Sequence, residues 1–230
     1  MTRKRITKKQ LKEDAFVTAA FEAEHYLREH LGLIIGGVLG AVALVGLVWM
    51  FVNYRIDRRD QASLALFKAE VTYLNGQFAI AATDFENLAN QYSGTLEAAK
   101  ALYLAGDSFF KDGDVDRALE MFNRCREEMS SSDPLMVNLL TGIGACHEQL
   151  KEYDQAEQLY RQAEQEAEYD FQKVEVLSSL SRALRLAGRE TEAIDVLTSI
   201  IDRFPDSPRK GEFIELRAEL QARSQAAAKS

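Results

Sequence analysis

The chain has 230 residues, of which 47% are hydrophobic and 28% charged, a composition that excludes collagen-like and low-complexity proteins. Its net charge of −8 is unevenly distributed. Residues 1–30 carry 7 Lys and Arg against 5 Asp and Glu, residues 31–52 carry no charge, and residues 53–230 carry 21 against 31. Such an acidic body argues against a nucleic-acid partner, whose phosphates would repel it.

Residues 1–30 are predicted to form a basic tail and an amphipathic helix. The first twelve residues hold no acidic side chain and six basic ones, namely Arg3, Lys4, Arg5, Lys8, Lys9 and Lys12. Apolar residues then recur at helical spacing through residue 27. The basic cluster either contacts anionic lipid head groups or acts only as a topology signal.

Residues 31–52 are predicted to form a single transmembrane helix. These 22 residues would extend about 33 Å as a helix, enough to cross a hydrocarbon core of about 30 Å. A cleaved signal peptide fits less well, because 30 residues precede the run and no Ala-x-Ala site follows it. The basic tail favours a cytoplasmic N-terminus, although Arg55, Arg58 and Arg59 follow the span.

Three glycines within this span recur every four residues, at Gly32, Gly36 and Gly40. A face of small residues lets a second helix approach closely, so the pattern predicts a contact with a partner helix or with a second copy. The alternative is that glycine is simply common in membrane helices.

Four similar passages occupy residues 62–205, after a helical linker at residues 53–61. They align on an alanine at intervals of 37, 38 and 37 residues, with a small residue twelve positions earlier and a bulky apolar residue four positions later. The alanines are Ala81, Ala118, Ala156 and Ala193; the small residues are Ala69, Gly106, Gly144 and Ser181; the bulky residues are Phe85, Phe122, Tyr160 and Leu197. This spacing predicts pairs of closely packed helices.

Glycines mark the expected turn within three of the pairs, at Gly76, Gly113 and Gly188, and Lys151 takes that place in the third pair. Residues 206–230 are predicted to form a capping helix and a frayed tail. The predicted fold class is therefore all-α, with one transmembrane helix, an α-solenoid of about four helix pairs and a C-terminal cap.

The repeat resembles the tetratricopeptide repeat, which has small residues at positions 8 and 20 and an aromatic residue at position 24. The layout of the whole chain, with "LKEDAF", the span, "FENLANQYSGT" and "RFPDSP", resembles the YfgM-like family of bacterial envelope proteins. That resemblance implies a single-pass inner-membrane protein with a periplasmic body, and the Sec translocon or periplasmic chaperones as partners.

The tetratricopeptide resemblance also implies a concave groove lined by the first helix of each pair. Its lining positions fall on Leu66, Glu70, Tyr73, Lys100, Tyr103, Asp107, Phe110, Asn138, Thr141, Glu148, Arg182 and Arg185. The aromatic residues suit apolar side chains of a bound segment, and the arginines suit carboxylates. The alternative is that Tyr103 and Phe110 pack against a neighbouring helix. The Lys and Asn arrangement with which related repeats hold a chaperone's terminal carboxylate is missing.

The sequence shows no phosphate-binding glycine loop, His-Glu-x-x-His motif or Cys-x-x-Cys pair, so we expect no enzymatic activity, no cofactor and no metal. His147 is expected to be a packing residue. Cys125 and Cys146 fall on helices that should touch, and they either form a disulfide or remain two buried thiols.

The predicted function is a membrane-anchored interaction protein that binds translocated or periplasmic polypeptides. The alternative is a structural subunit of an envelope complex without a client-binding groove.

Overall fold

The computed structural model describes residues 8–130 and 133–227, and before residue 35 it describes only the side chains of residues 24 and 28–33. The basic cluster and the apolar positions of the predicted amphipathic helix therefore lie outside the described side chains. The chain divides into two compact units, residues 1–57 and residues 58–230, which are treated separately below.

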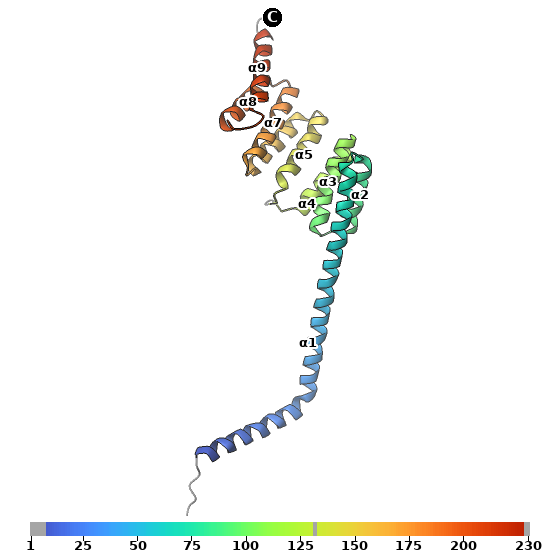
Figure 1. Cartoon of the computed structure of the whole chain (residues 1–230), viewed down its shortest axis with the longest axis vertical. Coiled ribbons are helices and arrows are strands. Elements are labelled where there is room, and N and C mark those ends of the chain that lie inside the picture. Colours follow the sequence, from blue (N-terminus) through green and yellow to red (C-terminus); the bar gives the residue numbers. More distant parts are fainter. Residues whose placement is uncertain (1–7, 131–132, 228–230) are drawn as a thin grey trace, which may run out of the picture. The chain divides into compact units, whose positions relative to one another are not determined.

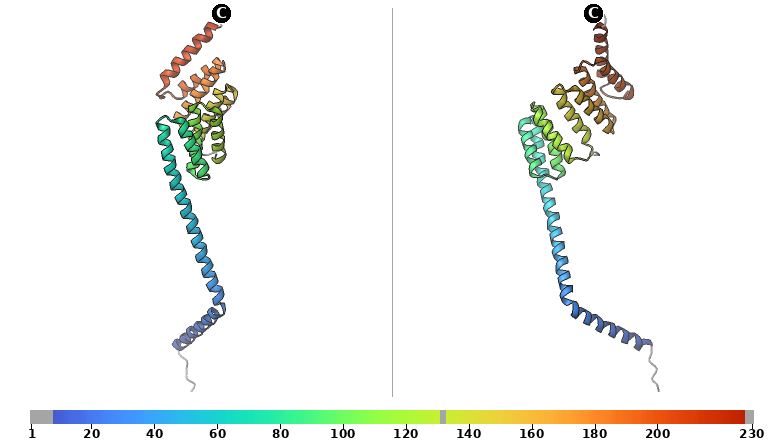
Figure 2. Two further views of the ribbon diagram at one scale, coloured as in Figure 1. Left: turned by 90° about the vertical axis from the view of Figure 1, so that its right-hand side faces the viewer. Right: turned by 180° about the vertical axis from the view of Figure 1, so that it is seen from behind.

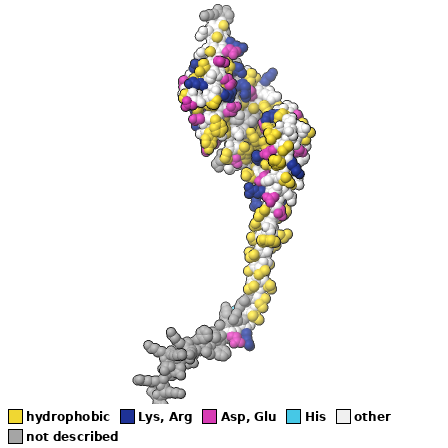
Figure 3. Space-filling view, in the orientation of Figure 1, with side chains coloured by type: hydrophobic (Ala, Val, Ile, Leu, Met, Phe, Trp, Pro, Cys, Tyr) yellow, Lys and Arg dark blue, Asp and Glu magenta, His cyan; other side chains and the backbone are white. Residues whose placement is uncertain are grey.

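The first unit consists of most of helix α1 (Lys8–Leu74). Within it, the large apolar side chains of residues 31–52 that the structure describes are exposed, for example Leu33 at 75% and Trp49 at 68%. Hydrophobic side chains cover the visible face of this stretch (Figure 3). By length and composition this part of α1 is able to cross a membrane, a property that it shares with signal sequences.

Helix α1 continues without a break where the sequence predicted a span, a linker and the first helix of the first pair. No proline and no glycine occurs between Gly46 and Gly76, so nothing in the sequence interrupts the helix. It ends before Gly76, which has a positive φ of 75°.

The second unit is built of helices alone over its described residues, which confirms the all-α prediction (Figures 1 and 2). The end of α1 pairs with α2, and three further pairs and a last helix follow. The helices are α2 (Phe78–Gln91), α3 (Leu96–Asp112), α4 (Val115–Glu128), α5 (Met136–Gln149), α6 (Tyr153–Glu166), α7 (Asp170–Leu186), α8 (Glu190–Arg203) and α9 (Lys210–Ala227).

The period of 37 to 38 residues has two structural causes. Helices α3 and α7 have 17 residues, about one turn more than the 14 residues of α2, α4, α5, α6 and α8. In addition, the connection from α4 to α5 is long, because it runs from Met129 to Leu135.

The repeated positions form the core. All four aligned alanines are 0% exposed, and the bulky residues four positions later are at most 2% exposed. Small residues allow this packing: a Cβ atom on Gly106 would lie 2.6 Å from the ring of Phe122, and one on Gly144 would lie 2.8 Å from the ring of Tyr160. Any larger side chain would force these helices apart.

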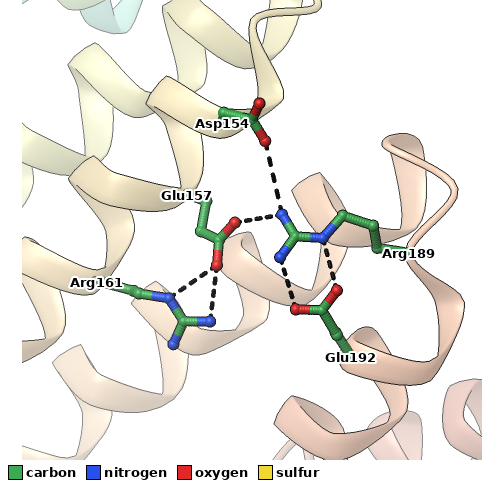
Figure 4. A network of polar contacts seen from close by, with 5 residues as sticks. All are labelled: Asp154, Glu157, Arg161, Arg189 and Glu192. Carbon is green, nitrogen blue, oxygen red and sulfur yellow. Dashed lines mark hydrogen bonds and ion pairs between the residues drawn. The ribbon is translucent and has the colours of Figure 1, made fainter.

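Ion pairs join the second helices of neighbouring pairs. Arg189, at the start of α8, contacts Glu157 and Asp154 of α6 and Glu192 of its own helix, while Arg161 also contacts Glu157 (Figure 4). Partial burial would raise the pKa of Glu157, but hydrogen bonds from Arg189 and Arg161 outweigh it and hold that pKa below its usual value.

The same direction of pairing recurs along the unit. Arg117 of α4 contacts Glu86 of α2, and Arg203 of α8 lies 2.8 Å from Glu164 of α6. In both cases the later pair supplies the base and the earlier pair supplies the acid.

Candidate functional site

A hollow of about 280 Å³ lies between the first helices of the second, third and fourth pairs. Its wall is formed by side chains from α3, α5 and α7, with Phe122 of α4 at its base. Of the residues predicted from the sequence to line a groove, five line this hollow: Tyr103, Asp107, Phe110, Asn138 and Thr141. The remaining lining residues are Phe122, Val137, Gly142, Ala145, Phe171, Gln172, Glu175 and Val176.

Tyr103 belongs both to the wall of the hollow and to the packed interior. Its ring centroid lies 5.9 Å from that of Phe122, at an interplanar angle of 43°. Burial raises the pKa of Tyr103 to about 12, and the nearby Asp107 carboxylate adds to the effect. The hydroxyl therefore stays protonated at physiological pH and is available as a neutral hydrogen-bond donor.

Asp107 on the same wall is held by two neighbours. Tyr73 of α1 donates a hydrogen bond to its carboxylate, and Lys111 Nζ lies 3.0 Å from Asp107 Oδ2. The Lys111 ammonium also lies 4.5 Å from the centre of the Tyr73 ring. Burial, together with the Asp107 contact, raises the pKa of Tyr73. Sequence reasoning placed Tyr73 and Asp107 in the groove but not in contact.

Four of the remaining charged residues of the predicted set pair within the chain. Lys100 Nζ lies 2.7 Å from Glu70, and Arg182 Nε lies 2.8 Å from Glu148. Tyr160 also donates a hydrogen bond to Glu148. These contacts neutralise Arg182, one of the two arginines expected to hold a ligand, and Arg185 does not line the hollow, which therefore offers mainly apolar and neutral polar surface.

Several predicted residues lie away from the hollow. Leu66 is 8% exposed and belongs to the core of the first pair. Arg185 is half-buried on α7 and does not line the hollow. A Cβ atom on any of the three span glycines, Gly32, Gly36 and Gly40, would meet no atom of the described structure within 4 Å, and their predicted contact with a second helix stays a prediction.

One prominent residue of the site escaped the sequence reasoning. Phe171, in the first turn of α7, is 71% exposed and lines the hollow. Its ring stacks on that of Tyr169, 59% exposed, with centroids 5.7 Å apart and an interplanar angle of 15°. Phe171 lies in the extra turn of α7, ahead of the ordinary repeat positions. The excess of the 37-residue period over the usual repeat length was the signal that an extra turn existed.

The polar clusters of the described chain offer no metal-binding group of three or more His, Cys, Asp and Glu side chains. His147 Nδ1 lies 2.7 Å from a carboxylate oxygen of Glu152. Cys125 and Cys146 are free, buried thiols, and burial raises the pKa of each to about 12. Both are therefore poor nucleophiles at neutral pH.

Comparison with protein families identifies tetratricopeptide repeats in residues 97–168 and again in residues 175–207. No curated protein sequence matches the chain. Solved structures are similar in fold at low sequence identity. PilF of Pseudomonas aeruginosa is 15% identical, with a TM-score of 0.58 over 73% of this chain and 71% of that chain. Nearly identical TPR-like repeats from Podosopora anserina are 14% identical, with a TM-score of 0.58 over 73% of this chain and 98% of that chain.

The matched residues cover α3 to α8, the same helices whose packing positions repeat in the structure. Residues 97–168 and 175–207 of this chain are tetratricopeptide repeats, and the helix pairs form a protein–protein interaction module.

Proposed function

We propose that the hollow between α3, α5 and α7 binds an apolar segment of a polypeptide. The observation that supports this proposal is the convergence of Tyr103, Phe110 and Phe171 on one cavity in a fold that serves protein–protein interaction. Aromatic side chains on a rigid wall supply large contact areas at low entropic cost.

The size and polarity of the hollow define the ligand. A volume of about 280 Å³ lies just below the range of small-molecule pockets, so it fits one or two apolar side chains rather than a whole metabolite. The exposed amide of Asn138 is available to the backbone of a bound segment. Glu175 on the wall is paired with Arg209, so it adds little net charge to the hollow.

We further propose that residues 31–52 anchor the chain in the bacterial inner membrane, with the N-terminus in the cytoplasm and the repeats in the periplasm. The uncharged run, its exposed apolar side chains and the YfgM-like layout support this arrangement. The clients are then translocated or periplasmic polypeptides, and the translocon and periplasmic chaperones are the candidate partners.

A binding experiment on the full-length chain tests the groove. The probe is a reduced, carboxymethylated protein that remains unfolded, carries a fluorophore and reports binding by anisotropy. Phe171→Ala should weaken binding at least fivefold while the circular dichroism spectrum stays unchanged, because the side chain is exposed. The matched control is Leu186→Ala, at the other end of the same helix and 51% exposed, which should bind like the wild type.

Equal affinity of the Phe171→Ala and wild-type chains would place the binding surface elsewhere. The structural-subunit alternative predicts a different pattern, namely no binding of the unfolded probe and one stoichiometric partner after detergent extraction.

A further inference from the structure

We propose that the first helix pair is a self-association surface, on which a second copy of this chain packs through the face of α1 formed by Leu64, Phe67, Val71 and Leu74. We call this face the α1 stripe. Its side chains are 57%, 63%, 42% and 80% exposed, respectively. They lie on the part of α1 that belongs to the unit of residues 58–230.

In the later pairs, the face equivalent to the α1 stripe packs on a neighbouring helix. The positions equivalent to Leu64, Phe67 and Val71, found by adding the repeat period, lie on α3, α5, α7 and α9. They are Ala101, Leu104 and Ser108; Leu139, Gly142 and Cys146; Val176, Ser179 and Ala183; and Phe213, Leu216 and Leu220. All of these are buried or half-buried, and each of these helices packs on the second helix of the preceding pair.

The first pair has no preceding pair, so its equivalent face is the one that the array leaves uncovered. A solenoid end normally carries polar residues there. The other end of this array follows that rule: Ile214, at 41%, is the one large apolar side chain exposed on the described part of α9. The two ends of the repeat array therefore differ, since one is polar and the other is apolar.

This difference between the two ends of the array indicates which surface packs on the α1 stripe. A head-to-tail contact would place the polar outer face of α9 on the stripe and would leave the apolar surface poorly covered. A stripe-to-stripe contact covers both surfaces at once, as in the isologous interfaces of two-fold dimers.

The spacing of the stripe fits such a contact. Leu64, Phe67, Val71 and Leu74 follow one another at three, four and three residues, the a and d spacing with which two helices interlock. Two exposed charges lie near the stripe, namely Lys68 beside it and Asp60 one turn before Leu64, while Glu70 is already paired with Lys100. In a parallel pairing Lys68 faces Ser63 of the second copy, whereas Asp60 faces its counterpart in the second copy, so the contact is confined to residues 64–74.

The stripe is short, and this sets the strength of the dimer. Four side chains of this size present on the order of 400 Å² per copy, about 800 Å² in total, which is below the size of stable specific interfaces and typical of a weak, transient one. The dimer should therefore dissociate within an accessible concentration range and appear as a concentration-dependent equilibrium.

Sedimentation velocity of the full-length chain in a density-matched detergent tests the proposal. The wild type should sediment as a dimer at tens of micromolar, and Phe67→Glu should raise the dissociation constant at least tenfold. Leu74→Glu, at the most exposed stripe position, is a second variant with the same expected result. Phe171→Glu is the control: it changes an equally exposed phenylalanine in the groove and should leave the dimer intact. Circular dichroism verifies that all three variants fold.

A wild-type chain that stays monomeric would overturn the proposal, and so would a dimer that survives both Phe67→Glu and Leu74→Glu. If Gly36→Ile with Gly40→Ile disrupts such a surviving dimer, the association belongs to the span instead. A monomer whose stripe variants lose a different, copurifying protein would show that a foreign helix is the occupant. None of these results depends on binding of the unfolded probe, because the groove and the stripe share no residue.

Discussion

The ring of Phe122 in α4 lies against the backbone of Gly142 in α5, so closely that a Cβ atom on Gly142 would lie 2.8 Å from ring atom Cζ. The same ring also lies close to Gly106 of α3, where a Cβ atom would be 2.6 Å from ring atom Cδ1. One phenylalanine therefore joins the second and third helix pairs, and it does so at the base of the proposed binding hollow.

Substitution of Gly142 by alanine should destabilise the protein by about 1–3 kcal/mol, the usual cost of overpacking a closed contact. Gly211→Ala is the control, since its Cβ meets no atom within 4 Å and it lies inside α9. That control should be neutral or slightly stabilising. Urea denaturation of both variants measures the effect, and equal midpoints would show that α5 can move away without cost.

Substitution of Lys151 by glycine should stabilise the protein by about 1 kcal/mol. Lys151 ends α5 with a φ of 63°, and the equivalent turn residues of the other pairs are glycines at 75°, 92° and 77°. A side chain in this left-handed conformation costs about 1–2 kcal/mol that glycine does not incur. Gly188→Lys, the reverse change in the fourth pair, should destabilise it. If Lys151→Gly lowers the urea midpoint, the lysine side chain stabilises the turn in another way.

The Glu157 network should make stability depend on acid pH. The folded-state pKa of Glu157 lies below its usual value of 4.5, so its contribution is complete above pH 4.5 and is lost as the pH falls through the folded-state pKa. Arg189→Gln removes the main hydrogen-bond donor. The variant should therefore be less stable than the wild type at pH 6, with a difference that shrinks toward pH 3. Thermal melts across this range measure it, and a difference independent of pH would contradict the assignment.

Cys125 and Cys146 should resist thiol reagents in the folded protein. Both are buried, with a pKa of about 12, so almost no thiolate forms at pH 8. A chromogenic disulfide reagent should titrate no thiol in the native chain and two thiols in guanidinium chloride. Detection of fewer than two thiols in the unfolded, unreduced chain would instead reveal a disulfide.

A reporter that fluoresces only in the cytoplasm should stay dark when it is fused after Ser230 of the chain expressed in a bacterium. The basic residues at the N-terminus should keep that end in the cytoplasm and send the repeats across the membrane. The same reporter fused before Met1 should fluoresce and serves as the control. A bright C-terminal fusion would reverse the proposed topology.

The sequence predicted the fold well because its signal lies in buried positions. Ala81, Ala118, Ala156 and Ala193 recur at nearly constant intervals, and close packing tolerates few other residues there. Gly142 was missed because it does not recur: its equivalents are Leu104 and Ser179.

The site was harder to predict, because partners on neighbouring pairs cannot be identified from one pair alone. Tyr103 and Phe110 were placed in the groove from the repeat register, and both line the hollow. The pairing of Glu148 with Arg182 depends on how far α7 is rotated against α5, which the register does not specify. Phe171 was missed because it precedes the register altogether.

Most of the ion pairs between neighbouring helix pairs have the same direction, with the base on the later pair and the acid on the earlier one. Arg117, Arg189 and Arg203 each contact a carboxylate of the preceding pair, as Arg182 and Arg209 also do. The pair of Arg59 in α1 with Glu97 in α3 runs in the opposite direction. Between the second and third pairs, no ion pair joins the described residues. Apolar contacts, such as that of Phe122 with Gly142, hold this junction together instead. High salt should therefore weaken the other junctions and spare the one between the second and third pairs, so that the α3 and α5 walls of the hollow stay together while its α7 wall loosens.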